Sequence, residues 1–193
     1  MRPILLLMAF TALGGLAACS GGTDDSDEAP TAGAPHAPPI GGHDLDKSTV
    51  TSIADGDANG TAFAGEYEVE IHTSACEGAC GPIESFGLPV TFCDVGETDH
   101  DQPNVTQTDG HVRMDTNAAV TRMEGGIDAE GSFDVGGYAT ALGGAIEVTG
   151  RVTGRLDVGV HAMTAEASGW AQGVVDGHYI DCVGTYEIRP AGD

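Results

Sequence analysis

Residues 146–158, IEVTGRVTGRLDV, decide the fold class of this chain. Apolar residues and glycines occupy every second position from Ile146 onward, and the positions between them are polar or charged. A period of two places alternate side chains on opposite faces of an extended strand, one face buried and the other in water. Gly150 and Gly154 fall on the apolar face, where a missing side chain permits a bend or close packing. The stretch therefore predicts a half-buried β-strand.

The same alternation continues on both sides of this stretch. Tyr67, Val69 and Ile71 alternate with glutamates and a histidine over residues 66–72. Further strands are expected at 88–94, 110–115, 118–124, 131–135, 138–142, 163–170, 173–180 and 182–189. Turn signals separate them, at Asp109-Gly110, Gly125-Gly126, Gly136-Gly137, Gly143-Gly144 and Asp176-Gly177. The pattern predicts an all-β antiparallel meander of about 8–10 short strands, folded as a small barrel or a sandwich.

The N-terminus has the layout of a secretory signal peptide. An apolar run follows Arg2 and ends in Leu16-Ala17-Ala18-Cys19, and it is shorter than the roughly 20 residues that span a bilayer. The ending resembles the bacterial lipobox, and this resemblance implies cleavage before Cys19 with lipid attached to its sulfur. Ser20, rather than Asp, follows, which in such proteins of enteric bacteria goes with the outer membrane. The alternative is a soluble secreted protein.

The composition divides the chain into three parts. We expect residues 1–18 to be the signal peptide and residues 19–60 to be the lipidated N-terminus with a disordered linker. The linker is acidic at first and then rich in proline, with almost nothing from which to build a core. Residues 61–193 are long enough for one β-domain with one core. The resemblance and this layout together predict a domain tethered in the cell envelope, with the membrane contacted through the lipid.

The charge of the chain restricts its partners. The sequence has 7 Lys and Arg against 30 Asp and Glu, a net charge of −23 at pH 7, and Lys47 is its one lysine. Such a surface repels nucleic acid and anionic lipid headgroups, so we exclude both as partners.

Apart from Cys19, four cysteines remain: Cys76, Cys80, Cys93 and Cys182. An even number in an exported chain predicts two disulfides, because the spacing lacks the paired C-x-x-C of structural zinc sites. If the first and last strands are neighbours in a closed sheet, Cys182 bonds either Cys76 or Cys80, and Cys93 takes the other.

One motif has the spacing of a metal site. Residues 55–66 resemble the EF-hand calcium loop, with Asp55, Asp57, Asn59 and Glu66 as ligands and Gly60 at the sharp turn. Ala62 stands where a larger apolar residue is usual, and a strand rather than a helix is expected from Tyr67 onward. We therefore expect a polar turn that leads into the first strand, and no metal.

Motifs for catalysis are absent from the sequence. There is no G-x-S-x-G, no H-E-x-x-H and no phosphate-binding glycine loop after a strand, and the seven histidines have no ligand spacing. We expect no catalytic residues and no cofactor. Two functions then compete: a non-catalytic interaction or structural module for an unknown protein partner, and a lipocalin-like carrier of a small apolar ligand. An empty apolar cavity inside a barrel would favour the carrier, and a filled core would favour the module.

Overall fold

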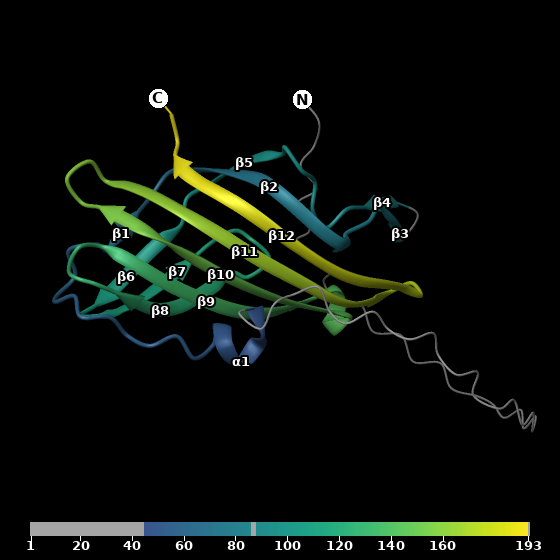
Figure 1. The fold of residues 1–193 in the computed structure, drawn as a ribbon, viewed down its shortest axis with the longest axis horizontal. Helices are drawn as coiled ribbons and strands as arrows, with labels where there is room; N and C mark the ends of the chain where they lie inside the picture. The colour runs from purple at the N-terminus through teal and green to yellow at the C-terminus, as the bar shows by residue number, and fades with distance from the viewer. Residues whose placement is uncertain (1–44, 86–87, 193) are drawn as a thin grey trace, which may run out of the picture. The chain divides into compact units, whose positions relative to one another are not determined.

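A computed structural model describes residues 45–85 and 88–192 of the chain, and its regular secondary structure is mainly β-strand (Figure 1). The elements in chain order are α1 (Lys47–Val50), β1 (Gly65–Glu66), β2 (Val69–Ala79), β3 (Ile83–Ser85), β4 (Leu88–Val90), β5 (Thr98–Asp101), β6 (Asn104–Thr108), β7 (His111–Asp115), β8 (Arg122–Ile127), β9 (Ser132–Ala141), the 3₁₀ turn η2 (Leu142–Gly144), β10 (Ile146–Asp157), β11 (Ala162–Val175) and β12 (His178–Pro190). The all-β prediction is confirmed.

Ten strands form one curled antiparallel sheet in the order β1-β6-β7-β8-β9-β10-β11-β12-β2-β5. From β6 to β12 each strand pairs with the next strand in the chain, as in a meander. In the chain, β1 is followed by β2, and β5 is followed by β6. β1 pairs with β6 and β2 pairs with β5, so these two chain segments join the two ends of the strand order. The sheet therefore has a barrel-like shape, and β3 and β4 form a separate hairpin (Figure 1).

The inward faces of the strands supply the core. In β10 the predicted alternation is confirmed: Ile146, Val152 and Leu156 are buried, whereas Glu147 and Asp157 are exposed. Each fully buried side chain of this size contributes about 1.5–3 kcal/mol to folding. The side chains of the main core cluster that are larger than alanine come from all around the sheet and are Phe63, Tyr67, Val69, Val105, Val112, Met114, Val120, Met123, Ile127, Phe133, Val135, Val152, Leu156, Met163 and Ile188.

Residues 45–58, which we call the strap, pack against the sheet although the sequence placed them with the linker. Leu45, Val50 and Ala58 are buried. The backbone N–H of Gly56 donates to the carbonyl of Gly110 at 2.9 Å, and that of Ala58 donates to the carbonyl of Ile127 at 3.1 Å. The few apolar side chains of the strap and its backbone hydrogen bonds therefore hold it on the folded domain.

The strap also explains why two predicted turns are wrong. Gly125-Gly126 lies inside β8 and Gly136-Gly137 lies inside β9, so the strands predicted on either side of the second pair are one strand. A Cβ on Gly126 would lie 2.4 Å from the carbonyl oxygen of Ala54, and one on Gly136 would lie 2.4 Å from that of Val50. These glycines permit close approach of the strap backbone.

The remaining turn predictions are confirmed. Asp109-Gly110 and Asp176-Gly177 join consecutive strands, with Asp109 and Asp176 in the left-handed conformation, and Gly143-Gly144 lies in η2. The turn at Asp176 shows that the strand expected at 173–180 is divided between β11 and β12. β3, β5 and β6 were not predicted: β3 is only three residues long, β5 is entirely polar, and in β6 polar residues surround Val105.

The structure contains two disulfides, Cys76–Cys93 and Cys80–Cys182. β12 lies antiparallel to β2 with Cys182 opposite Gly78, so the first and last long strands are neighbours, as the pairing argument required. The two bridges join residues 17 and 102 positions apart. By loop entropy alone, bridges over such loops restrict the unfolded chain by about 3 and 4.7 kcal/mol.

Candidate functional site

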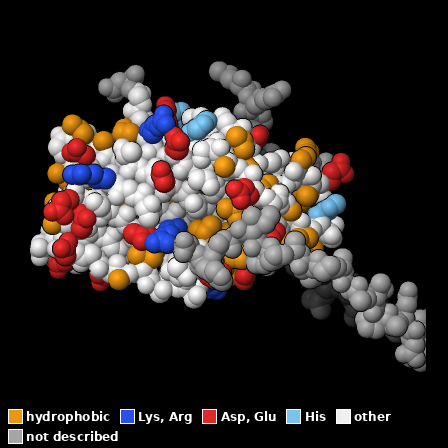
Figure 2. Space-filling model, viewed as in Figure 1, with side chains coloured by type: hydrophobic (Ala, Val, Ile, Leu, Met, Phe, Trp, Pro, Cys, Tyr) orange, Lys and Arg blue, Asp and Glu red, His pale blue; other side chains and the backbone are white. Residues whose placement is uncertain are grey.

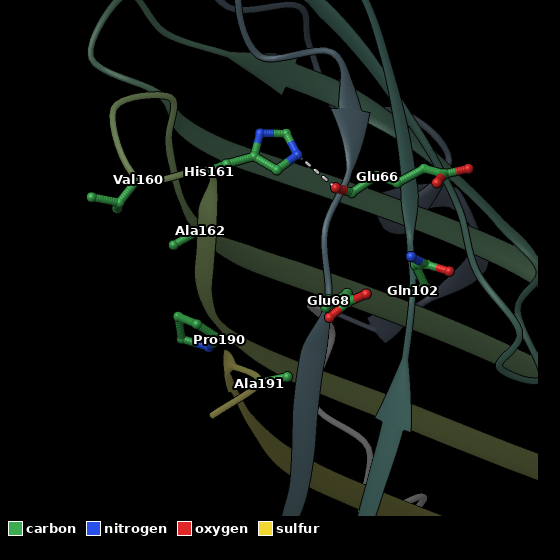
Figure 3. A pocket seen from close by; sticks show the side chains of 8 residues that line it. All are labelled: Glu66, Glu68, Gln102, Val160, His161, Ala162, Pro190 and Ala191. Atoms are coloured by element: carbon green, nitrogen blue, oxygen red, sulfur yellow. Dashed lines mark hydrogen bonds between the residues drawn. The ribbon is translucent and has the colours of Figure 1, made fainter. Parts of the chain in front are cut away.

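An open depression of about 630 Å³ lies at one end of the sheet (Figure 3). The turn between β10 and β11, the segment that joins β1 to β2, the link between β5 and β6, and the C-terminal residues meet there. Eight residues line it: Glu66, Glu68, Gln102, Val160, His161, Ala162, Pro190 and Ala191.

His161 holds this end of the sheet together. Its Nε2 lies 2.7 Å from the carbonyl oxygen of Glu66, and a carbonyl can only accept, so Nε2 carries the hydrogen. Its ring stacks on that of Tyr67, with centroids 4.5 Å apart and planes 17° apart. Gly65 leaves room for the ring, since a Cβ there would lie 2.8 Å from Cε1 of His161. His161 is therefore a positioning residue that fixes the β10–β11 turn.

Tyr67 lies beneath His161 and is nearly fully buried. Its hydroxyl donates a hydrogen bond to the carbonyl of Phe63 at 2.9 Å. Burial raises the pKa of the Tyr67 hydroxyl above its ordinary value, so it stays neutral at physiological pH. This hydroxyl serves the packing of the core.

The depression has a polar side and an apolar side. Figure 3 shows Glu66, Glu68 and Gln102 grouped on one side, and Val160, Ala162 and Pro190 on the other. Glu66 and Glu68 are both exposed, and Val160 keeps 74% of its surface exposed. Carboxylates attract cationic groups, and an aliphatic wall can pack the methylene stem of a lysine or arginine.

Acidic side chains also gather around this end of the molecule. Figure 2 shows several of them, with a Lys or Arg side chain among them, at the left of the face in view, which is the end that holds the β10–β11 turn in Figure 1. Together with Glu66 and Glu68 on the depression itself, they give this end of the molecule carboxylates that attract cationic partners from a distance.

The Asp55–Glu66 loop has the turn that the motif requires, but its carboxylates have separate partners. Gly60 adopts φ +75°. Asp55 Oδ1 lies 2.8 Å from Nδ1 of His111, and Asp57 Oδ1 accepts the backbone N–H of Ala129 at 3.2 Å. Glu66 lies on β1 and lines the depression. Within residues 45–85 and 88–192, no three His, Cys, Asp or Glu side chains are grouped to hold a metal ion.

The other predicted site residues divide between the described and undescribed parts. Cys76, Cys80, Cys93 and Cys182 form the two disulfides, whereas Cys19 lies outside the described residues. No helix in the described part is long and apolar enough to cross a membrane. The contact of His161 with Tyr67 could not be predicted, because no local sequence pattern joins residues so far apart.

Comparison with protein families, with curated proteins and with solved structures finds no significant match to this chain. The site is therefore interpreted from its own chemistry.

Proposed function

We propose that this chain is a lipoprotein anchored in the bacterial cell envelope through Cys19, with a β-domain that is a non-catalytic module for binding a basic partner. The observation that carries the binding proposal is the depression at His161, with two carboxylates on one side and aliphatic side chains on the other. The outer membrane is the favoured location, because Ser20 follows the cysteine.

The anchor is supported by the sequence and by the cysteine chemistry of the domain. The apolar run that ends in Leu16-Ala17-Ala18-Cys19 resembles a lipobox, and two disulfides fit a compartment outside the reducing cytosol. Two or more acyl chains make such an anchor stable, since each buried methylene contributes about 0.8 kcal/mol.

The packing of the core favours a binding module over a carrier of a small apolar ligand. Side chains such as Met114, Phe133 and Met163 occupy the inside of the curled sheet. A small barrel filled in this way has its binding surfaces outside. The large open depression is accordingly the surface we assign to the partner.

The anchor is tested by replacing Cys19 with Ser in the full chain expressed in a bacterial host. We expect the variant to lose incorporation of labelled palmitate and to leave the membrane fraction. Cys93→Ser is the matched control, because it removes a cysteine of the domain and should keep both the label and the membrane association. Labelling that persists in Cys19→Ser contradicts the anchor.

The binding surface is tested with an octalysine peptide as probe. Replacing Glu66 and Glu68 together with Gln should weaken its binding about tenfold, since two charges next to an apolar wall are lost. The control replaces Glu97 and Glu130, which are exposed elsewhere, with Gln and loses the same charge. Equal weakening in both double variants would show that binding depends on total charge, which contradicts a site at the depression.

A further inference from the structure

A second, much smaller cavity of about 40 Å³ lies on the outer face of the sheet, away from the depression. It is lined by Lys47, Tyr138, Glu147, Thr149, Trp170 and Gln172. Thr149 on β10 lies directly opposite Tyr138 on β9 and directly opposite Trp170 on β11. Two aromatic residues therefore flank one threonine in a groove across three strands, and the lysine reaches over it from α1.

Thr149 is unusual because its hydroxyl is buried without a partner. The residue is 5% exposed, and its Oγ1 makes no hydrogen bond. Buried polar groups are nearly always paired, so an unpaired one in a native fold requires an explanation, such as a role in binding.

The polar groups around Thr149 are directed elsewhere. Trp170 Nε1 donates to Asp181 Oδ1 at 2.7 Å, and the Tyr138 hydroxyl donates to Glu147 Oε1 at 2.9 Å. Gln172 Nε2 lies 3.3 Å from the Tyr179 hydroxyl. The groove is thus held in shape by its own hydrogen bonds, and the Thr149 hydroxyl remains available to an occupant.

The groove already receives an ammonium group from the chain itself. Nζ of Lys47 lies 3.4 Å from the centroid of the Tyr138 ring, a cation–π contact. Glu147 adds a carboxylate beside the same ring. Lys47 is the one lysine of the chain, and it belongs to the strap rather than to the sheet. A movement of the strap would therefore remove the Lys47 ammonium group from the groove.

We propose that this groove is a binding site for a primary alkylammonium group, filled by Lys47 in the closed form and available to an external ligand when Lys47 leaves. The cation lies over Tyr138 near Glu147, and the Thr149 hydroxyl accepts a hydrogen bond from the ligand. Lys47 lines this cavity, so its departure would add the space of its own ammonium group to the groove. The site is separate from the depression and does not depend on the proposed function.

Trp170 reports directly on the groove, because it is the one tryptophan of the chain. The experiment follows Trp170 fluorescence while n-butylammonium chloride, which reproduces a lysine side chain, is added to the full chain at constant ionic strength. With Lys47→Ala we expect a saturable change whose half-saturation concentration is at least tenfold lower than in the unmodified chain. Neutral n-butanol should give no saturable change.

Two further variants in the Lys47→Ala background identify the site. Tyr138→Leu removes the ring, and Glu147→Gln removes the charge, and each should weaken the response at least fivefold. Glu166→Gln is the matched control, since it makes the same change at an exposed position on the neighbouring strand and should leave the response unchanged. Circular dichroism checks that each variant is folded.

Three results would overturn the proposal: no saturable change in Lys47→Ala, an equal response to n-butanol, or equal weakening by Glu147→Gln and Glu166→Gln. The first would mean that the groove holds water only, and the third that butylammonium binds to the acidic surface in general. None of these results bears on binding at the depression, because Tyr138 and Glu147 lie outside it.

Discussion

The imidazole of His161 lies flat on the ring of Tyr67, with 4.5 Å between the ring centroids. Tyr67 is a buried residue in the short link between β1 and β2, and His161 ends the turn between β10 and β11 with φ +51°. A non-glycine residue in this left-handed conformation costs of order 1 kcal/mol, and the stacking and the hydrogen bond to Glu66 offset this cost. The pair shapes the depression, since both Glu66 and His161 line it.

His161→Ala should lower the free energy of unfolding by about 1–2 kcal/mol, because aromatic stacking contributes roughly 0.5–1.5 kcal/mol and a hydrogen bond a similar amount. His161→Phe keeps the stacking and loses the hydrogen bond, so it should cost less. Urea unfolding followed by circular dichroism measures both. If both variants are as stable as the unmodified chain, the contacts of His161 with Tyr67 and Glu66 contribute nothing to stability.

Gly65 provides an internal check on the same contact. Gly65→Ala should destabilise the unmodified chain, since the new Cβ would lie 2.8 Å from the His161 ring. It should cost less in the His161→Ala background, where the ring is gone. A double-mutant cycle gives the coupling between the two positions.

The strap makes a prediction about the glycines beneath it. Gly136→Ala should displace the strap, because the Cβ would meet the carbonyl oxygen of Val50 at 2.4 Å, which is backbone and cannot move away by itself. We expect faster amide hydrogen exchange in residues 45–58 and a loss of about 1–3 kcal/mol, as for other overpacking changes.

Gly150→Ala is the matched control. Its Cβ would meet Val120 Cγ2 at 3.5 Å, an ordinary contact, and exchange in the strap should not change. The proposed role of Gly136 is wrong if both substitutions, or neither, loosen the strap.

Much of the fold could be predicted from periodicity, and the exceptions have a common cause. Residues 146–158 alternate cleanly because one face of β10 meets the core and much of the other meets water. The pairs Gly125-Gly126 and Gly136-Gly137 read as turns because glycine pairs are common in turns. Here one glycine of each pair, Gly126 and Gly136, permits a distant segment to cross the sheet, and the sequence around them contains no sign of that segment.

The candidate sites were less predictable for the same reason. The disulfides could be narrowed to two arrangements, because Cys182 had to lie near the end of the first long strand. The depression joins residues 66–68 to 160–162 and 190–191, and the groove joins α1 to three strands. Such sites depend on strand order and register, which composition does not determine.

A network of two arginines around Asp115 predicts a change of stability in acid. Arg113 Nη2 lies 2.6 Å from Asp115 Oδ2, and Arg122 Nε lies 3.1 Å from Oδ1. The hydrogen bond from Arg113 is the main cause that lowers the pKa of Asp115 below its ordinary value of 3.8, and Arg122 adds to it. A lowered carboxyl pKa stabilises the fold above pH 3.8, and this stability is lost as the pH falls through the pKa in the folded state.

We therefore expect Asp115→Asn to be less stable than the unmodified chain at pH 6, with the difference shrinking as the pH is lowered from 4 toward 2. Urea unfolding at several pH values in one buffer series measures this. A difference that stays constant across the range would show that Asp115 acts through packing and not through its charge.

The unpartnered hydroxyl of Thr149 predicts that one substitution raises stability and lowers binding. Thr149→Val keeps the shape of the side chain and removes a group whose burial without a hydrogen bond costs about 1–3 kcal/mol, so the free energy of unfolding should rise by about 1 kcal/mol. Thr116→Val is the matched comparison: its hydroxyl donates to the Val120 carbonyl at 3.0 Å and accepts from the Ala118 N–H at 3.2 Å, so stability should fall. Urea unfolding of both variants measures the difference in stability, and equal losses of stability in the two variants would contradict the prediction.

In the Lys47→Ala background, Thr149→Val should also weaken the response to butylammonium, because a residue retained at a cost in stability is expected where binding requires it.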